Sequence, residues 1–477
     1  MSELNEPLVS VYITNYNYGK FLQEAIESVL AQTFKYFELI IIDDGSTDNS
    51  REIISRYDGI ENVFSLFQEN RGLIRSSNVA LNLARGKYIM RLDADDYITS
   101  QALEIMISEL SRHPEAVLVF PDYYLIDETG ELMGEFKRHN FEKDVKLRDQ
   151  PAHGACSMIR KDVLKSIGGY DPAFSMQDGY DLWLSIENLY PIRNINLPLF
   201  YYRQHDASLS KDESKLLETR SKIKEKHVIK RGLKALTVLA IIPVRGESID
   251  PRSRPFKKLG KKCLIDWTIE VALASQLVKD VIVTSPENKV LDYTKRKYPG
   301  IILVERDRNF ASINSGIEDT VFESLNFYSR DHQLPDAVML LYIESPFRSS
   351  MYIDKAIHTL QLYDVDNVDG VRPDNDMFYV HKGNGLEPWH GMEPWSKSKT
   401  LRLERQELYR RAGGIHLILT STLFEKKNIL GGKIGHVILD QSASFSIRSE
   451  LDWDIAEIIA SKEIIRQEDD KVTTTHA

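Results

Sequence analysis

KYIMRLDADD, residues 87–96, is the most informative segment for the fold expected in the first half of the chain. Residues 87–92 are a strand-forming, largely apolar run, and Asp93-Ala94-Asp95-Asp96 follows it without a break. Carboxylates at this spacing repel one another and cost stability unless a cation or hydrogen-bond donors satisfy them. A hard divalent ion with oxygen ligands, Mg²⁺ or Mn²⁺, is one solution. A solvated turn whose aspartates cap a helix is the other.

The same arrangement recurs on the N-terminal side of this stretch. Two further strand-like runs end in the polar clusters TNYNYG (14–19) and DDGSTD (43–48). Because open α/β sheets bind ligands at the carboxyl ends of their strands, these clusters are expected to share one edge. Strands are expected at 9–13, 38–42, 87–92 and 116–120, and helices at 21–31 and 47–57, the second helix being capped by Ser46 or Thr47. This alternation predicts a mainly parallel α/β sheet.

The character of the chain changes after residue 210. Lys, Glu and Arg dominate 211–235, with sparse apolar residues at helical spacing, which predicts a charged helical linker that either is solvated or packs on a neighbouring body. The α/β alternation restarts at Leu236. The expected organisation is a first domain at 1–210, the linker at 211–235, a second domain at 236–467 and a flexible polar tail at 468–477. In the second domain, strands are expected at 237–244, 281–284, 301–304, 338–342 and 415–419, and a helix is expected at 265–274.

Composition limits the class of protein. The chain has 477 residues, enough for two or three domains, with 61 basic and 71 acidic side chains and a net charge of −10. This balance argues against nucleic acid as a partner. The two cysteines, Cys156 and Cys263, form no disulfide framework, and the longest apolar run, 238–244, is too short to span a bilayer. A cytoplasmic protein is expected, in contact with the inner face of the membrane at most peripherally.

The ordered set of motifs in the first half resembles glycosyltransferase family 2, which has the GT-A fold. The resemblance covers residues 7–210 and rests on the three clusters above together with SVLAQT (28–33), GGYD (168–171), MQDGYDLW (176–183) and YRQH (202–205). Where many members of the family have Glu before the last aspartate, this chain has Gln177. The resemblance implies a nucleotide-sugar donor, most readily a UDP-sugar, and a bound Mn²⁺ or Mg²⁺ ion.

The resemblance also assigns roles to residues. Asp178 matches the carboxylate that deprotonates the acceptor hydroxyl, and a base there needs hydrogen-bond reach to the acceptor oxygen. Metal ligands are Asp93, Asp95 and His205, although His205 is nearly as well explained as a structural histidine. Tyr180 and Trp183 are expected in the core. The residues expected at the nucleotide-sugar are Thr14, Asn15, Tyr16, Asp44, Arg71 and Asp93, with a solvated surface as the alternative for Arg71.

In the second half, a strand leads into a basic, glycine-containing loop, IIPVRGES (241–248), which continues to Lys258. Such a loop can hold phosphates through backbone N–H groups and fixed cations. With the segments IESPFR (343–348), RRAGGI (410–415) and SELD (449–452), it resembles the acylneuraminate cytidylyltransferases, which are CMP-sialic acid synthetases with a Rossmann-type fold. Coverage is residues 236–460. Candidate residues for CTP or a CMP-sugar are Arg245, Gly246, Ser248, Arg254 and Lys257.

Several positions depart from that family. Ser248 is followed by Ile249 where Lys is usual, and the loop is longer. Ser446 and Arg448 stand where the family has two metal-binding aspartates, and an arginine there would repel the ion on which nucleotidyl transfer depends. The second domain is therefore expected to be degenerate.

The motifs thus predict two tandem nucleotide-binding α/β domains. The leading hypothesis is a metal-dependent inverting glycosyltransferase that acts on a surface glycan or a lipid-linked acceptor, with a cytidylyltransferase-like domain attached. One alternative is a bifunctional enzyme that also makes a CMP-activated acidic sugar. Another is a C-terminal module that binds nucleotide or forms a homodimer. The donor sugar, the acceptor and the linkage are not specified by any pattern in the sequence.

Overall fold

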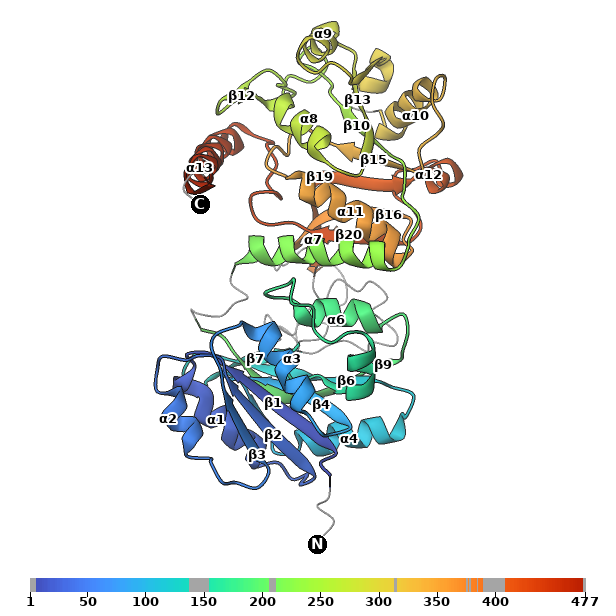
Figure 1. Ribbon diagram of the computed structural model, residues 1–477. Coiled ribbons are helices and arrows are strands. Elements are labelled where there is room, and N and C mark those ends of the chain that lie inside the picture. Colours follow the sequence, from blue (N-terminus) through green and yellow to red (C-terminus); the bar gives the residue numbers. More distant parts are fainter. Residues whose placement is uncertain are drawn as a thin grey trace. The chain divides into compact units, whose positions relative to one another are not determined.

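The computed structural model of the chain shows two compact units, one formed by 1–220 with 376–406 and the other by 221–375 with 407–477 (Figure 1). Each unit is described by itself. The residues described are 6–136, 154–205, 212–312, 315–374, 376, 379–383, 385–388 and 408–474, with side chains to residue 462 at the C-terminal end.

Unit 1 is built on a mixed sheet. Its described strands follow the order β3-β2-β1-β4-β8-β6-β9-β5, and β7 pairs with β6. The first four in this order are parallel, as the sequence predicts, whereas β8, β5 and β7 are antiparallel additions. The strands are β1 (Val9–Asn15), β2 (Phe37–Asp43), β3 (Val63–Phe67), β4 (Tyr88–Asp93), β5 (Tyr97–Ile98), β6 (Leu118–Ile126), β7 (Leu132–Phe136), β8 (Met158–Arg160) and β9 (Ile192–Arg203).

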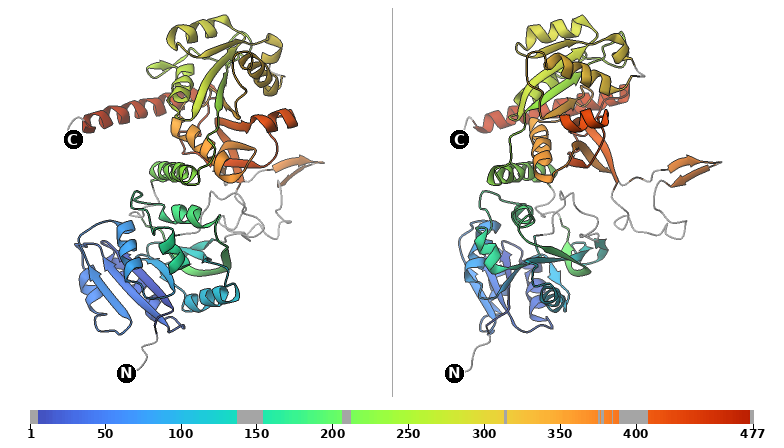
Figure 2. Two further views of the ribbon diagram at one scale, coloured as in Figure 1. Left: turned by 45° about the vertical axis from the view of Figure 1, so that its right-hand side comes forward. Right: turned by 90° about the vertical axis from the view of Figure 1, so that its right-hand side faces the viewer.

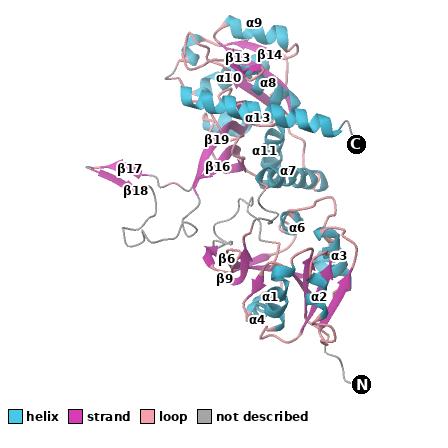
Figure 3. Ribbon diagram, turned by 90° about the vertical axis from the view of Figure 1, so that its left-hand side faces the viewer, coloured by secondary structure: helices cyan, strands magenta, loops and turns pink. Residues whose placement is uncertain are grey.

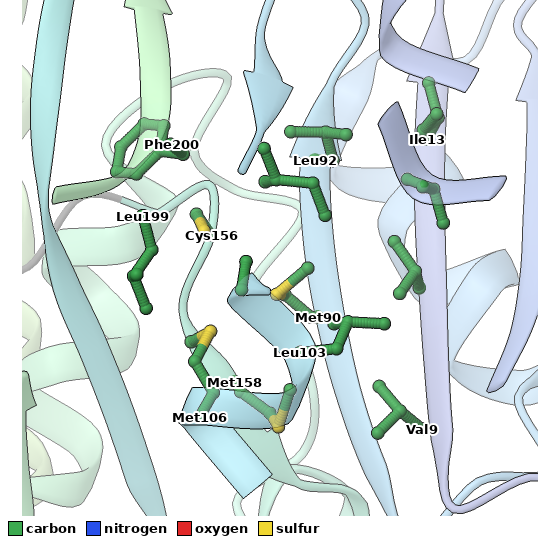
Figure 4. Packing of buried hydrophobic residues seen from close by; sticks show 14 of the residues in the cluster. Val9, Ile13, Met90, Leu92, Leu103, Met106, Cys156, Met158, Leu199 and Phe200 are labelled. Carbon is green, nitrogen blue, oxygen red and sulfur yellow. The ribbon is translucent and has the colours of Figure 1, made fainter. Parts of the chain in front are cut away.

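Helices cover this sheet because their apolar residues recur at helical spacing. In the first helix the buried positions include Leu22, Ala25, Ile26 and Val29, which form one stripe. Figure 4 shows the core that results, with side chains from β1, β4, α4, β8 and β9 in one cluster. The helices are α1 (Gly19–Leu30), α2 (Ser50–Ser55), α3 (Leu73–Leu83), α4 (Ala102–Arg112), α5 (Lys161–Ser166) and α6 (Asp178–Ile186).

Two local expectations for unit 1 can be compared with its structure. The predicted cap of the second helix is wrong, because α2 begins at Ser50 after Asn49. Ser46 instead accepts hydrogen bonds from the side chain of Asn15 and the backbone of Asn17, so its hydroxyl serves the loop after β1. The core assignment of Tyr180 and Trp183 is confirmed, since each is 1% exposed.

Unit 2 repeats the same architecture. Its main sheet has the order β14-β13-β10-β15-β19-β16-β20, parallel from β14 to β15 and then mixed. Figures 2 and 3 show this unit from further directions, with helices around its strands. Its strands are β10 (Val238–Pro243), β13 (Val278–Ser285), β14 (Ile302–Glu305), β15 (Ala337–Leu341), β16 (Asn367–Asp374), β19 (Leu408–Leu419) and β20 (Ile434–Ile438). A short antiparallel pair in unit 2 is formed by β11 (Lys258–Leu259) and β12 (Lys262–Cys263). A second short antiparallel pair, β17 (Tyr379–Lys382) with β18 (Gly385–Pro388), is grouped with unit 1.

The helices of unit 2 flank its sheet. The predicted helix at 265–274 is α8 (Leu264–Ala274), and its apolar residues Ile265 and Ile269 are fully buried. A single 3₁₀ turn, η2 (Arg308–Ala311), precedes α10. The remaining helices are α9 (Asn288–Lys297), α10 (Ile317–Tyr328), α11 (Ser350–Tyr363), α12 (Thr420–Lys426) and α13 (Glu450–Thr474).

The charged stretch predicted as a linker is helical. It forms α7 (Glu213–Lys230), and the second half of this helix belongs to unit 2. There Lys224 donates a hydrogen bond to Thr359 at 2.9 Å and lies over the ring of Tyr363. The predicted tail at 468–477 begins inside α13, and its last three residues lie outside the described part. Within the described ranges, no helix is both long enough and apolar enough to cross a bilayer.

Candidate functional site

The candidate site of unit 1 lies where β1, β2 and β4 end. The parallel register places Thr14 beside Asp93 and Asn15 beside Asp43, so the polar clusters that follow these strands come together at one edge. This juxtaposition is the one that the sequence predicts, because all three strands run in the same direction.

The acidic turn after β4 meets the end of β9. Asp95 lies 2.9 Å from Nε2 of His205, and both side chains are largely buried. Burial of the Asp95 carboxyl, reinforced by the charge of Asp93, raises its pKa. The pKa of Asp96 is raised by burial and by the charges of Asp95 and Asp93, and its Oδ2 is buried with no hydrogen-bond partner. The turn therefore concentrates more negative charge than the surrounding protein satisfies.

Arg203 organises this acidic turn, and sequence reasoning did not assign it a role. It is 2% exposed, donates from Nε to the backbone oxygen of Asp95 at 2.9 Å, and contacts the carboxylate of Glu24 at 2.5 Å. Its backbone N–H donates to Asp96, and its guanidinium lies 4.8 Å from the ring centroid of Phe21. The one available signal was an arginine inside the aromatic run FYYRQH.

Asp178 stands at the first position of α6, directly after Gln177, which has a left-handed backbone conformation. It is 7% exposed, and its Oδ2 lies 2.5 Å from Nη1 of Arg91 in β4. Arg91 is itself buried, and its Nε lies 2.9 Å from Oδ1 of Asp93. Burial alone would lower the pKa of Arg91, but Asp178 and Asp93 outweigh it and raise the pKa well above its ordinary value. Arg91 thus joins two of the predicted site residues, although the sequence-based assignment omitted it.

Asp44 holds the loop that follows β3. Its carboxylate accepts hydrogen bonds from the Gln68 side chain at 2.7 Å and from the backbone N–H groups of Arg71 and Gly72 at 3.0 and 2.7 Å. The left-handed φ of +85° at Gly72 favours glycine there. Asp44 is therefore tied to the stretch that carries Arg71, whose side chain is exposed.

The remaining predicted contacts on β1 differ in exposure. Asn15 is buried, and its amide nitrogen donates to Asp43 and Ser46, which gives this side chain a structural task. Tyr16 is 46% exposed and Thr14 is 9% exposed. Of these three side chains, that of Tyr16 is the most accessible to an incoming molecule.

Two carboxylates of this edge could hold a divalent ion. Asp93 and Asp95 carry carboxylate oxygens, which are hard ligands. Oδ1 of Asp93 is buried and forms an ion pair with Arg91, but it accepts no well-aligned hydrogen bond. Across the described ranges, no group of three or more His, Cys, Asp or Glu side chains is arranged to hold an ion.

In unit 2, the basic loop after β10 is closed by carboxylates of the same unit. Arg245 lies 3.7 Å from Asp250, and both Arg254 and Lys257 pair with Glu450 at the start of α13, at 2.6 and 3.6 Å. The predicted phosphate-binding cations therefore already have anionic partners.

The glycine of this loop faces another carboxylate. Glu287 accepts a hydrogen bond from the backbone of Ser248 at 2.6 Å, and a Cβ on Gly246 would lie 2.2 Å from its Cδ. Burial of Glu287 tends to raise its pKa, but hydrogen bonds from Ser248 and Lys289 lower it, so the group is a carboxylate. A negative charge occupies one side of the expected phosphate cradle.

The positions expected to bind the catalytic ion of unit 2 hold no carboxylate. The hydroxyl of Ser446 is hydrogen-bonded to that of Ser345 at 2.7 Å, and the backbone N–H of Arg448 donates to the Asp452 carboxylate in the first turn of α13. The structure therefore gives these two residues local packing roles.

Fold and site define the class of unit 1: a sheet with aspartates gathered at its carboxyl edge, as in GT-A glycosyltransferases. Comparisons with known proteins give the family. The profile for glycosyl transferase family 2 matches residues 10–168, and the profile for cytidylyltransferases matches 239–389. The uncharacterized glycosyltransferase MJ1057 of Methanocaldococcus jannaschii is 34% identical over 212 residues, which cover 43% of this chain and 73% of that protein.

The chondroitin synthase of Escherichia coli is 31% identical over 191 residues, covering 40% of this chain and only 28% of that protein. Among solved structures, Staphylococcus aureus TarS 1-349 in complex with UDP-GlcNAc aligns with a TM-score of 0.40 and 19% identity, over 46% of this chain and 66% of that one. The chain belongs to glycosyltransferase family 2, and its second half is a cytidylyltransferase-like unit. The resemblances inferred from the motifs are thereby confirmed.

Proposed function

We propose that unit 1 is a metal-dependent, inverting glycosyltransferase that moves a sugar from a UDP-sugar to a surface glycan or a lipid-linked acceptor. The observation that carries the proposal is the meeting of Asp93, Asp95 and Asp178 around one sheet edge. The match with a chondroitin synthase supports a glycan as the acceptor. The proposed place of action is the cytoplasm, with at most peripheral contact with the inner face of the membrane.

The side chains divide the work of transfer. Asp93 and Asp95, with His205 beside them, would hold the ion. When bound, Mn²⁺ or Mg²⁺ supplies positive charge that stabilises the departing nucleoside diphosphate. Asp178 accepts the proton of the acceptor hydroxyl as that oxygen attacks the anomeric carbon. A single displacement of this kind inverts the configuration. Contacts to the nucleotide are assigned to Thr14, Asn15, Tyr16, Asp44 and Arg71.

A panel of nucleotide-sugars tests this proposal. The full chain is mixed with each compound, with and without Mn²⁺, and its thermal unfolding is followed, because a ligand that binds the folded state raises stability by mass action. The compound that stabilises in a Mn²⁺-dependent way is then offered with candidate glycans, and UDP release and the anomeric configuration of the product are measured. Stabilisation by GDP-sugars alone would refute the UDP assignment, and a product with retained configuration would refute single displacement.

For unit 2 we propose a binding or self-association module that does not catalyse nucleotidyl transfer. The supporting observation is that Arg245, Arg254 and Lys257 pair with carboxylates of their own unit. In addition, Ser446 stands where the resembled family has a metal-binding aspartate, and its hydroxyl is hydrogen-bonded to that of Ser345. Incubation with CTP, Mg²⁺ and acidic nine-carbon sugars should therefore release no pyrophosphate. Release that disappears on Arg245→Gln would instead establish the bifunctional enzyme. Measurement of mass in solution tests the homodimer.

A further inference from the structure

Arg91 is a buried cation in the middle of the candidate site. It lies in β4, where the neighbouring residues Met90 and Leu92 are apolar and fully packed. Placing a charge in such a strand costs free energy unless partners surround it, so an arginine here needs an explanation. We propose that Arg91 is a positioning residue of the transfer reaction, which holds Asp178 in a fixed relation to the donor-binding Asp93. The inference rests on the proposed function of unit 1.

The geometry shows how one guanidinium serves both carboxylates. Arg91 and Asp93 are two residues apart on one strand, so their side chains leave the same face of the sheet. Nε of Arg91 lies 2.9 Å from Oδ1 of Asp93, and Nη1 lies 2.5 Å from Oδ2 of Asp178. The planar, forked guanidinium reaches two groups at once, which the single ammonium of a lysine does not.

The surroundings leave Arg91 little freedom. A Cβ added to Gly154 would lie 2.8 Å from Nη2 of Arg91 and 3.5 Å from Oδ2 of Asp178. The backbone at this position therefore approaches the ion pair closely, and a larger residue there would displace the guanidinium or the backbone. On another side, Tyr12 donates a hydrogen bond to Tyr170 at 3.1 Å, and both hydroxyls contribute to the electrostatic environment of the guanidinium.

This arrangement has a consequence for the base. With Oδ2 of Asp178 bound to Arg91, the carboxylate is oriented, and its second oxygen is the one available to an acceptor hydroxyl. The distance between the attacking oxygen and the anomeric carbon then depends on a rigid link of three side chains. Misplacement by about 1 Å in such a link typically costs on the order of 100-fold in rate.

The test compares Arg91→Lys with a matched control, Arg85→Lys. Arg85 also pairs with a buried carboxylate of unit 1, that of Glu38 at 2.7 Å, but it lies away from the site and is 66% exposed. For Arg91→Lys we expect kcat for UDP release to fall by roughly 100-fold. The affinity for UDP with Mn²⁺ should stay within about 3-fold, because a lysine keeps the positive charge beside Asp93. The control should retain wild-type values.

A second variant, Gly154→Ala, leaves every charge in place and only crowds the pair. We expect it to lower kcat on the order of 10-fold, again with UDP affinity unchanged. Equal kcat values for Arg91→Lys and Arg85→Lys would overturn the proposal. So would a loss of UDP affinity as large as the loss of kcat, because that pattern marks a residue needed only for folding or donor binding.

Failure of the proposed function is distinguishable from failure of this inference. If the wild-type chain releases UDP from no donor, the proposed transfer is wrong, and amide hydrogen exchange of the full chain still tests positioning. Loss of the link should speed exchange in the first turn of α6, where Tyr180 and Asp181 donate to the backbone oxygen of Gln177. Faster exchange there in Arg91→Lys than in Arg85→Lys supports positioning, and equal exchange refutes it.

Discussion

Replacing Arg203 by methionine should destabilise unit 1 and disable its acidic turn. Methionine keeps an apolar stem over Phe21 but removes the donors to the backbone oxygens of Asp95, Asp127 and Glu128 and the partner of Glu24. Glu24 is 53% exposed, so its ion pair adds little, and loss of the hydrogen bonds that the buried guanidinium donates to the backbone costs about 3–5 kcal/mol in total. For a unit of this size, that corresponds to a fall of about 10 °C in the midpoint of thermal unfolding.

The assay must resolve the two units, because a chain with two bodies need not unfold in one step. Thermal proteolysis of the full chain, read by mass spectrometry of peptides from 6–205, reports on unit 1 alone. Arg85→Met is the matched control. Its side chain is 66% exposed and Glu38 keeps other donors, so its loss should cost about 1 kcal/mol or less. If Arg203→Met lowers the midpoint no more than Arg85→Met does, the role assigned to Arg203 is wrong.

Three further outcomes are expected. Asp95→Asn should abolish the Mn²⁺-dependent part of stabilisation by UDP, measured by thermal shift, while the unfolding midpoint without ligand stays close to wild type. Asp44→Asn should weaken UDP binding on the order of 10-fold, measured by calorimetry, because an amide cannot accept all three donors that hold the loop carrying Arg71. In unit 2, the Lys234 ammonium and the Thr237 N–H lower the pKa of Asp336 to about 2 from 3.8. The ionised Asp336 therefore contributes fully to the stability of the folded unit above about pH 4, and this contribution is lost as the pH falls through about 2. Asp336→Asn should therefore cost about 1 kcal/mol at pH 7, allowing for partial exposure, and nothing near pH 2, by urea unfolding at each pH.

The sequence by itself determined the class of fold and the order of its parts. Hydrophobic periodicity and turn residues act over a few neighbouring positions, so β1, β2, β4 and the first strand of unit 2 could be placed within one or two residues. The carboxyl ends of parallel strands share an edge, which is why the pairing of Thr14 with Asp93 was predictable. Ordered motifs also identified both families, because each motif is a local string.

Tertiary structure alone decided which charges meet. Arg91 and Asp178 are 87 residues apart and Arg203 and Glu24 are 179 apart, and no periodic pattern couples such positions. The same holds in unit 2, where Glu450 from α13 pairs with Arg254 of a loop that looked free to bind phosphate. Arg91 and Asp178 are both buried, and the removal of water that strengthens their attraction is a property of the packed chain. The sequence therefore named the carboxylates of the site, and the packed chain determined the arginines that hold them.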